Sequence, residues 1–214
     1  MQVDPRLCTG CGRCISVCAA GAIRLERGDG ERRAVVDPDL CVECGVCLRL
    51  GICAAKALVP TALQWPRTLR SIFSDPLTEF QETQVTGRGT EEMKTNDVTG
   101  RFSFGEVGLA IDVGRPNATT RLADVQRVTQ ALAAAGAVFE EDNPVTHLMQ
   151  DRSRGLIRPD VLNERVMSVV VEAKIPLARL GEALRALRVA AEQVDTVFCV
   201  GVISRVTADS RIEA

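Results

Sequence analysis

Two short stretches decide the fold of the first part of the chain. Residues 8–18 read CTGCGRCISVC, and residues 41–53 read CVECGVCLRLGIC. The first has the spacing C-x2-C-x2-C-x3-C and the second C-x2-C-x2-C-x5-C. The flanking residues repeat as well, because DPRLC in the first half is matched by DPDLC in the second. This is an internal duplication, so we expect each half to fold in the same way around the same kind of centre.

The cysteine spacing indicates iron–sulfur clusters. Three thiolates two residues apart on a tightly turning loop can bind three corners of one cubane, and Gly10, Gly12 and Gly45 let the backbone come close to it. A disulfide framework is one alternative, but it is typical of small secreted domains, and no secretion signal is visible here. Zinc is the other alternative, but zinc ribbons use two CxxC pairs with four ligands in total. The duplicated triplets favour two [4Fe–4S] clusters.

Residues 1–60 resemble the bacterial 2[4Fe–4S] ferredoxin family. In these proteins the fourth cysteine of each motif ligates the other cluster. The resemblance therefore implies two ligand sets: Cys8, Cys11, Cys14 and Cys53 for cluster 1, and Cys18, Cys41, Cys44 and Cys47 for cluster 2. Two departures from the family pattern stand out. Ala19 and Ala54 replace the proline that usually follows the fourth cysteine, and the second motif has two extra residues within 48–52. All eight ligands remain.

Composition excludes several classes of protein. The 214 residues carry a net charge of −2, with basic and acidic residues interspersed, so nothing points to a nucleic acid or an anionic membrane as partner. No apolar run is long enough for a transmembrane helix. The sequence enters a cysteine motif without a leader-like segment, so we expect a cytoplasmic protein, and its clusters suggest an anaerobic setting.

Residues 61–105 are expected to form a linker and a Gly/Thr-rich loop. Within them, residues 86–105 read TGRGTEEMKTNDVTGRFSFG. One hypothesis is a solvated loop with turn-forming residues. The other is an anion site for a cofactor or substrate, formed by Arg88, Lys94 and Arg101. The stretch matches neither the Walker loop nor the dinucleotide-binding fingerprint.

Residues 106–214 predict a second domain with the order strand–helix–strand, strand–helix–strand. Residues 107–113 alternate between apolar and small or polar side chains, and residues 122–135 and 177–194 have helical spacing. The whole chain is therefore α+β: a dicluster ferredoxin domain followed by a split βαβ sandwich, which resembles ACT domains in topology. Two helices cover only one face of such a sheet. We expect the other face to pack against the cluster domain, a second copy or another subunit.

A few single residues carry further expectations. Trp65 and Phe73 are expected to pin the linker to a neighbouring surface. Cys199, in the last strand, is expected to be a buried small hydrophobe. His147 is expected in a surface loop, with proton transfer as the alternative role. No catalytic triad or paired-carboxylate spacing is present.

The sequence predicts an electron-transfer protein or subunit that passes single electrons at low potential to a redox partner or catalytic subunit. A second hypothesis rests on the stretch GRGTEEMKTNDVTGR after the two-cluster domain. Residues 1–110 are similar in this respect to the N-terminal part of 6-hydroxynicotinate reductase-type proteins. The resemblance implies that the chain is the electron-input part of a ferredoxin-dependent reductase of a nitrogen heterocycle. A redox- or ligand-sensing regulator is the third hypothesis.

Overall fold

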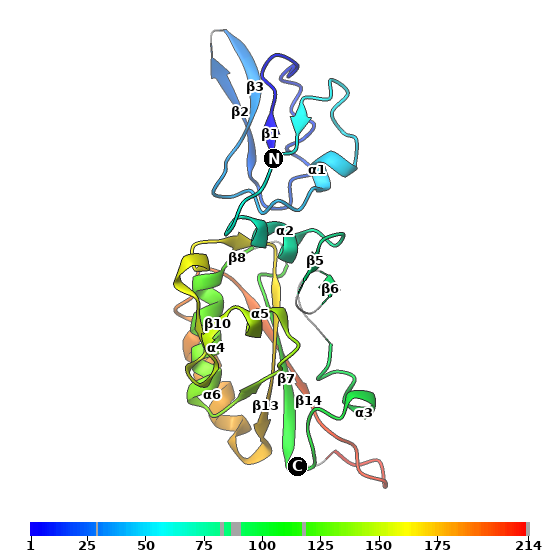
Figure 1. The fold of residues 1–214 in the computed structure, drawn as a ribbon, viewed down its shortest axis with the longest axis vertical. Helices are drawn as coiled ribbons and strands as arrows, with labels where there is room; N and C mark the ends of the chain where they lie inside the picture. The colour runs from blue at the N-terminus through cyan, green and yellow to red at the C-terminus, as the bar shows by residue number, and fades with distance from the viewer. Residues whose placement is uncertain (29, 82–83, 87–90, 117–118, 213–214) are drawn as a thin grey trace.

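The computed structural model describes residues 1–28, 30–81, 84–86, 91–116 and 119–212. Along its longest axis, a small N-terminal domain lies at one end and a larger domain at the other (Figure 1). Helix α2 (Thr68–Ser74) lies between them.

The N-terminal domain is built from two small antiparallel sheets. Strand β1 (Gln2–Val3) pairs with β4 (Leu58–Val59), which ties together the two ends of the duplicated segment. Strands β2 (Ile23–Gly28) and β3 (Glu31–Val36) form a hairpin. Pairing extends to Gly28 and Glu31, so almost all of the segment from Ile23 to Val36 is strand. The longer second motif contains a one-turn helix, α1 (Val46–Arg49).

The larger domain contains a four-stranded antiparallel sheet. Its strands are β7 (Glu106–Val113), β9 (Val138–Phe139), β13 (Val169–Pro176) and β14 (Phe198–Ile203), in the order β14-β7-β13-β9. Helices α4 (Leu122–Ala134) and α6 (Leu180–Ala191) pack on one face. The order of these elements along the chain is the predicted one, while the likeness to ACT domains stays a prediction.

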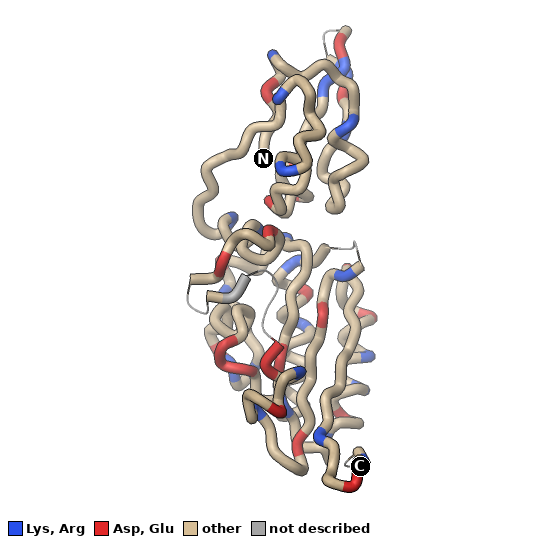
Figure 2. The backbone as a smooth tube through the Cα atoms, turned by 90° about the vertical axis from the view of Figure 1, so that its right-hand side faces the viewer, with Lys and Arg blue, Asp and Glu red and all other residues tan. Residues whose placement is uncertain are grey.

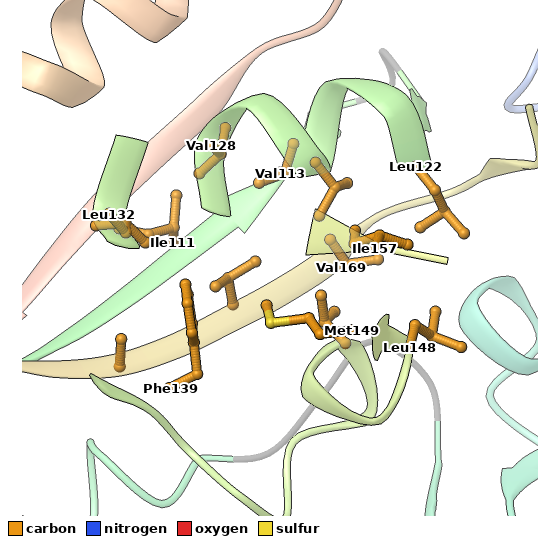
Figure 3. Packing of buried hydrophobic residues seen from close by; sticks show 14 of the residues in the cluster. Ile111, Val113, Leu122, Val128, Leu132, Phe139, Leu148, Met149, Ile157 and Val169 are labelled. Atoms are coloured by element: carbon orange, nitrogen blue, oxygen red, sulfur yellow. The ribbon is translucent and has the colours of Figure 1, made fainter. Parts of the chain in front are cut away.

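Apolar alternation explains which face of the sheet is buried. In β7, Leu109, Ile111 and Val113 point to the helices and are fully buried, and Val128 and Leu132 of α4 pack over them (Figure 3). Helix α4 begins after Arg121 and has no side-chain cap at that residue.

Shorter elements complete the larger domain. Three small sheets pair β5 (Glu79–Phe80) with β6 (Val85–Thr86), β8 (Thr120–Arg121) with β12 (Arg165–Val166), and β10 (Met149–Asp151) with β11 (Leu156–Ile157). The short helices are α3 (Asn96–Thr99) and α5 (Pro144–His147), with 3-10 helices at Arg152–Arg154, Pro159–Val161 and Leu177–Arg179.

Helix α2 belongs to the core of the larger domain. Leu69 and Phe73 have no exposed surface, and they join the same apolar cluster as the sheet and its helices, together with Phe80. The prediction that Phe73 pins its segment to a neighbouring surface is confirmed. The described part of residues 61–105 therefore packs as part of this domain rather than as a free linker.

The second face of the sheet is covered in part by the same chain. A methyl group placed on Gly108 would lie 2.8 Å from Phe102 and 3.1 Å from Met93, so this end of the sheet is in close contact with the stretch before β7. The sequence did not suggest that cover. Cys199 lies on the edge strand β14, where it is exposed, so the expectation that it is buried was wrong. An interface on the remaining surface stays a prediction.

Among the described residues, no helix has the length and hydropathy that crossing a membrane requires.

Candidate iron–sulfur site

The eight cysteines of the two motifs line two separate cavities. Cys8, Cys11, Cys14 and Cys53 line one of about 250 Å³. The other cavity is smaller, with a volume of about 20 Å³, and is lined by Cys18, Cys41, Cys44 and Cys47. The loops thus bring together the two sets that the ferredoxin resemblance implies. The ligation itself stays a prediction, and a cubane in the smaller cavity requires its thiols to move apart.

Each of the two cavities is lined by four thiols. Over the described residues, no three of the His, Cys, Asp and Glu side chains converge as the ligands of one metal ion. A tetrahedral zinc site needs four ligand atoms close to one point. In a cubane each thiolate binds a different iron, so the ligands stand further apart. A zinc ribbon uses one such set of four ligands, whereas this segment has two sets with duplicated triplet spacing, which is the donor set of two [4Fe–4S] clusters.

Backbone N–H groups are directed at cysteine sulfur in both halves. Ala22 donates to Cys18 Sγ and Ala57 donates to Cys53 Sγ, each over 3.2 Å. Both donors lie four residues after the cysteine, so the duplication is kept at the level of single hydrogen bonds. Ala34 in β3 donates to Cys8 Sγ over 3.3 Å. Such bonds stabilise negative charge on sulfur and help to set the potential of a cluster.

The surroundings of the thiols shift their pKa values, upward for the buried ones and downward for an exposed one. Burial raises the pKa of Cys14, Cys41 and Cys44. Burial, followed by the charges of the neighbouring cysteines, raises the pKa of Cys47 to about 11. A backbone hydrogen bond from Arg13 lowers the pKa of Cys11, which is exposed. Since iron binds thiolates, most of these ligands must lose a proton when a cluster is inserted.

Glycine is required where the first loop meets the hairpin. Gly10 has φ of +66°, and a methyl group there would lie 2.2 Å from the carbonyl oxygen of Arg32. No other residue fits both the backbone conformation and the space. The contact fixes the Cys8–Cys14 loop against β3.

Helix α2 binds the loop that carries the second cysteine set. The Arg70 guanidinium donates to the carbonyl oxygens of Pro38, Asp39 and Cys41, over 2.7, 3.3 and 2.9 Å. Its Nε lies 2.5 Å from Glu164, in the larger domain. Arg70 is almost fully buried. One side chain thus joins a ligand-bearing loop to the larger domain.

A second arginine of this region reinforces the contact. Arg67, just before α2, pairs with Glu43 over 2.6 Å and donates to the carbonyl oxygen of Pro38 over 2.9 Å. Neither Arg67 nor Arg70 was singled out from the sequence, because nothing in the spacing of these two residues reveals that they meet a loop some thirty residues earlier.

The comparison with protein families agrees with this geometry. Residues 7–57 match the model of the 4Fe-4S dicluster domain, so this segment is a ferredoxin-like iron–sulfur domain. The match covers about a quarter of the chain and says nothing of the rest. Searches of curated proteins and of solved structures found no match.

The predicted anion site is not assembled in the described residues. Arg88 lies outside them. Lys94 is 3.5 Å from Glu91, and Arg101 pairs with Glu92, Glu140 and Asp142 over 3.2, 3.0 and 2.8 Å. An anion at Arg101 would have to displace carboxylates. Glu140 is buried in this network.

A further cavity, which no cysteine lines, lies beside α2. Its volume is about 550 Å³, and Trp65, Ser71, Phe80, His147 and Arg158 are among its lining residues. The Trp65 indole donates to Asp160 over 2.7 Å, and the Arg158 guanidinium lies 5.0 Å from its ring centre. Trp65 therefore anchors its segment to the larger domain, as expected. His147 is exposed, as expected, but it lies in helix α5 and not in a loop, with its ring 5.9 Å from that of Phe80.

Proposed function

We propose that this protein carries two [4Fe–4S] clusters and passes single electrons at low potential to a partner oxidoreductase or catalytic subunit. The observation that carries this proposal is the division of eight thiols between two cavities, four to each, inside a segment that matches the dicluster family. When bound, such clusters supply reversible one-electron chemistry.

The residues of the chain give the two ends of the site different roles. The first set, with its exposed Cys11, belongs to the end of the molecule away from the larger domain (Figure 1). The second set adjoins α2, because Arg70 binds the carbonyl oxygen of Cys41. Electrons that enter through the first set would therefore leave through the second, toward the larger domain or a partner bound there.

The test is anaerobic reconstitution of the full chain with iron and sulfide. We expect about eight irons per chain, as two cubanes require. We also expect a broad visible absorption that bleaches with dithionite and a reduced-state electron paramagnetic resonance (EPR) signal split by coupling between two clusters. One bound zinc or a set of disulfides, with no such absorption, would contradict the proposal.

The cavity beside α2 favours a second candidate function, the electron-input part of a reductase of a nitrogen heterocycle. Thr68, Ser71 and Ile72 of α2 line this cavity, while Arg67 and Arg70 bind the loop of the second cysteine set from another side of the same helix. A molecule in the cavity would lie about one helix diameter, roughly 10–12 Å, from that loop.

This second candidate has its own experiment. The reduced protein is mixed with 6-hydroxynicotinate, and reoxidation is followed in the visible region. Reoxidation that is lost in the Ser71→Trp variant, which fills the cavity, supports a substrate site. Reoxidation at the rate of the buffer control, in a protein that dithionite reduces fully, rules out this substrate for the lone chain.

A further inference from the structure

The β2–β3 hairpin has two faces with different charge. Side chains alternate between the faces of a strand, so residues 23, 25 and 27 share one face with their partners 36, 34 and 32. This face meets the first cysteine loop: a methyl group on Gly12 would lie 3.2 Å from Leu25, and one on Gly10 would lie 3.1 Å from Cβ of Arg32. We call it the loop-side face of the hairpin.

Two arginines lie directly opposite each other on the loop-side face. Arg27 and Arg32 are register partners, and both are exposed. Neither has an acidic partner among the described residues. Like charges that face each other across a strand pair destabilise the hairpin. The repulsion between Arg27 and Arg32 therefore does not help to fold the domain, and we look for its use in binding.

The other face of the same hairpin is charge-balanced. Arg24 pairs with Glu26 over 2.8 Å and with Asp37 over 3.2 Å. Arg33 pairs with Glu31 over 2.8 Å. Among the described residues of the hairpin, the unpaired positive charge therefore lies on the side that faces the first cysteine loop.

The surface beside the loop-side face exposes a cysteine ligand. Cys11 is the exposed cysteine of the two motifs, and Arg13 lines its cavity and is exposed as well. Two large apolar side chains lie next to motif cysteines, Leu7 before Cys8 and Ile15 after Cys14, with 48% and 37% of their surface exposed. Exposed apolar residues with basic residues at their margin are typical of a protein-binding surface.

The position of this surface suits an incoming electron carrier. The turn of the hairpin lies at the end of the molecule farthest from the larger domain (Figure 1), and Figure 2 shows several basic positions in this part of the N-terminal domain. The second cysteine set offers less room, because α2 and the Arg70 contacts occupy the side of its loop.

We propose that Arg13, Arg27 and Arg32, with Leu7 and Ile15, form the docking surface for an acidic electron-carrier protein that delivers electrons to the first cysteine set. Opposite charge speeds the encounter of two proteins and fixes their orientation. One electron passes from the reduced carrier to the cluster of the first set, so the carrier is oxidised and the cluster reduced by one electron, and no proton or bond needs to move. The inference rests on the proposed function and names its partner and entry point.

The test uses the reconstituted full chain and a flavodoxin of net negative charge as the probe. The double variant Arg27→Gln/Arg32→Gln is compared with Arg24→Gln/Arg33→Gln, which loses the same charge from the other face of the hairpin. Binding of the oxidised flavodoxin is measured by calorimetry. Electron transfer from its hydroquinone is measured by stopped flow, at low and at high salt.

We expect the loop-side variant to weaken binding about tenfold at low salt and to slow electron transfer by a similar factor. The control variant should stay within about twofold of the unchanged chain. The difference should disappear at high salt, because screening removes it. The loop-side variant should also unfold at a slightly higher temperature, since it removes like-charge repulsion, so a loss of binding cannot come from a loss of fold.

The proposed docking surface would be wrong if the two double variants changed binding and electron transfer equally, or if binding did not depend on salt. Dithionite separates this result from a failure of the proposed function. If dithionite reduces every variant equally while flavodoxin neither binds nor reduces the unchanged chain, only the docking surface is wrong. If dithionite itself finds no clusters to reduce, the proposed function is wrong and the docking surface falls with it.

Discussion

At the scale of single residues, two glycines separate a steric requirement from a conformational one. Gly10 and Gly21 have nearly the same φ, +66° and +63°, but a methyl group on Gly21 would meet nothing within 4 Å. Gly21→Ala should therefore lower the free energy of unfolding only by the strain of alanine in a left-handed conformation, about 1–2 kcal/mol. Gly10→Ala adds a clash with the Arg32 carbonyl and should lower the melting temperature of the N-terminal domain clearly more. Equal melting temperatures would show that the loop can move away from β3.

The cysteines allow a second comparison at this scale. Cys11→Ser removes one of four thiols from the first cavity, so we expect a loss of up to half of the bound iron. Cys199→Ser changes an exposed thiol on β14 that lines neither cysteine cavity, and should leave the iron content unchanged. Iron and sulfide analysis after anaerobic purification measures both. A loss of iron in Cys199→Ser would mean that this residue takes part in cluster binding.

Sequence reasoning worked for residues whose spacing reflects their chemistry. The eight cysteines could be found because ligands of a cubane need that spacing on a tight loop. Arg70 could not be found, because its partners depend on how α2 packs between distant segments. Cys199 was misjudged for a related reason: strand residues are usually buried, but this one lies on an edge strand beyond the reach of the covering loop.

At the scale of elements, helix α2 contacts both domains: it packs in the core of the larger one, and Arg70 binds the loop of the second cysteine set. Replacing Arg70 with Met should destabilise the protein by about 3 kcal/mol, because Glu164 would be left nearly buried without its partner. The loss of a positive charge beside Cys41 should also lower the reduction potential of one cluster and leave the other unchanged. Thermal unfolding and an EPR-monitored redox titration measure the two effects.

A matched control for α2 is Arg179→Met. Arg179 pairs with Glu182 over 2.9 Å at the start of α6, but both side chains are exposed. Water and salt screen such an exposed pair, so its loss should change the stability little. If Arg70→Met changed the melting temperature no more than Arg179→Met does, or shifted both potentials equally, α2 would not be a specific link to the second cysteine set.

Strands and helices of the larger domain could be predicted because each has a clear period. The alternation in β7 and the helical stripe in α6 each identify an element and its buried face. The position of residues 91–102 could not be predicted, since that stretch has no period of its own. It is held by individual contacts, such as that of Phe102 with Gly108 and the hydrogen bond that the backbone N–H of Met93 donates to the carboxylate of Glu172.

At the scale of the whole molecule, the two domains have very different cores. The larger domain has a continuous buried cluster that extends from Leu69 to Leu187. In the N-terminal domain the buried cluster consists of Cys14, Ile23, Ala34 and Leu58, with most of the motif cysteines packed around it. A segment of about 60 residues buries little apolar surface, so this domain has to obtain its stability elsewhere. In the proposed holoprotein, the iron–thiolate bonds are that source.

Removal of iron should therefore unfold one domain and leave the other folded. After treatment with a chelator and a mild oxidant, we expect trypsin to cut at the arginines of the first 60 residues within minutes, while residues 106–212 resist. Trp65 gives a second readout, because it is the one tryptophan of the chain and binds Asp160 of the larger domain. Its emission should keep the wavelength of the folded protein as the N-terminal domain unfolds. If instead the whole chain became sensitive to trypsin together, the clusters would be needed for the fold of both domains, and the Arg70 contacts would couple them far more strongly than two separate cores suggest.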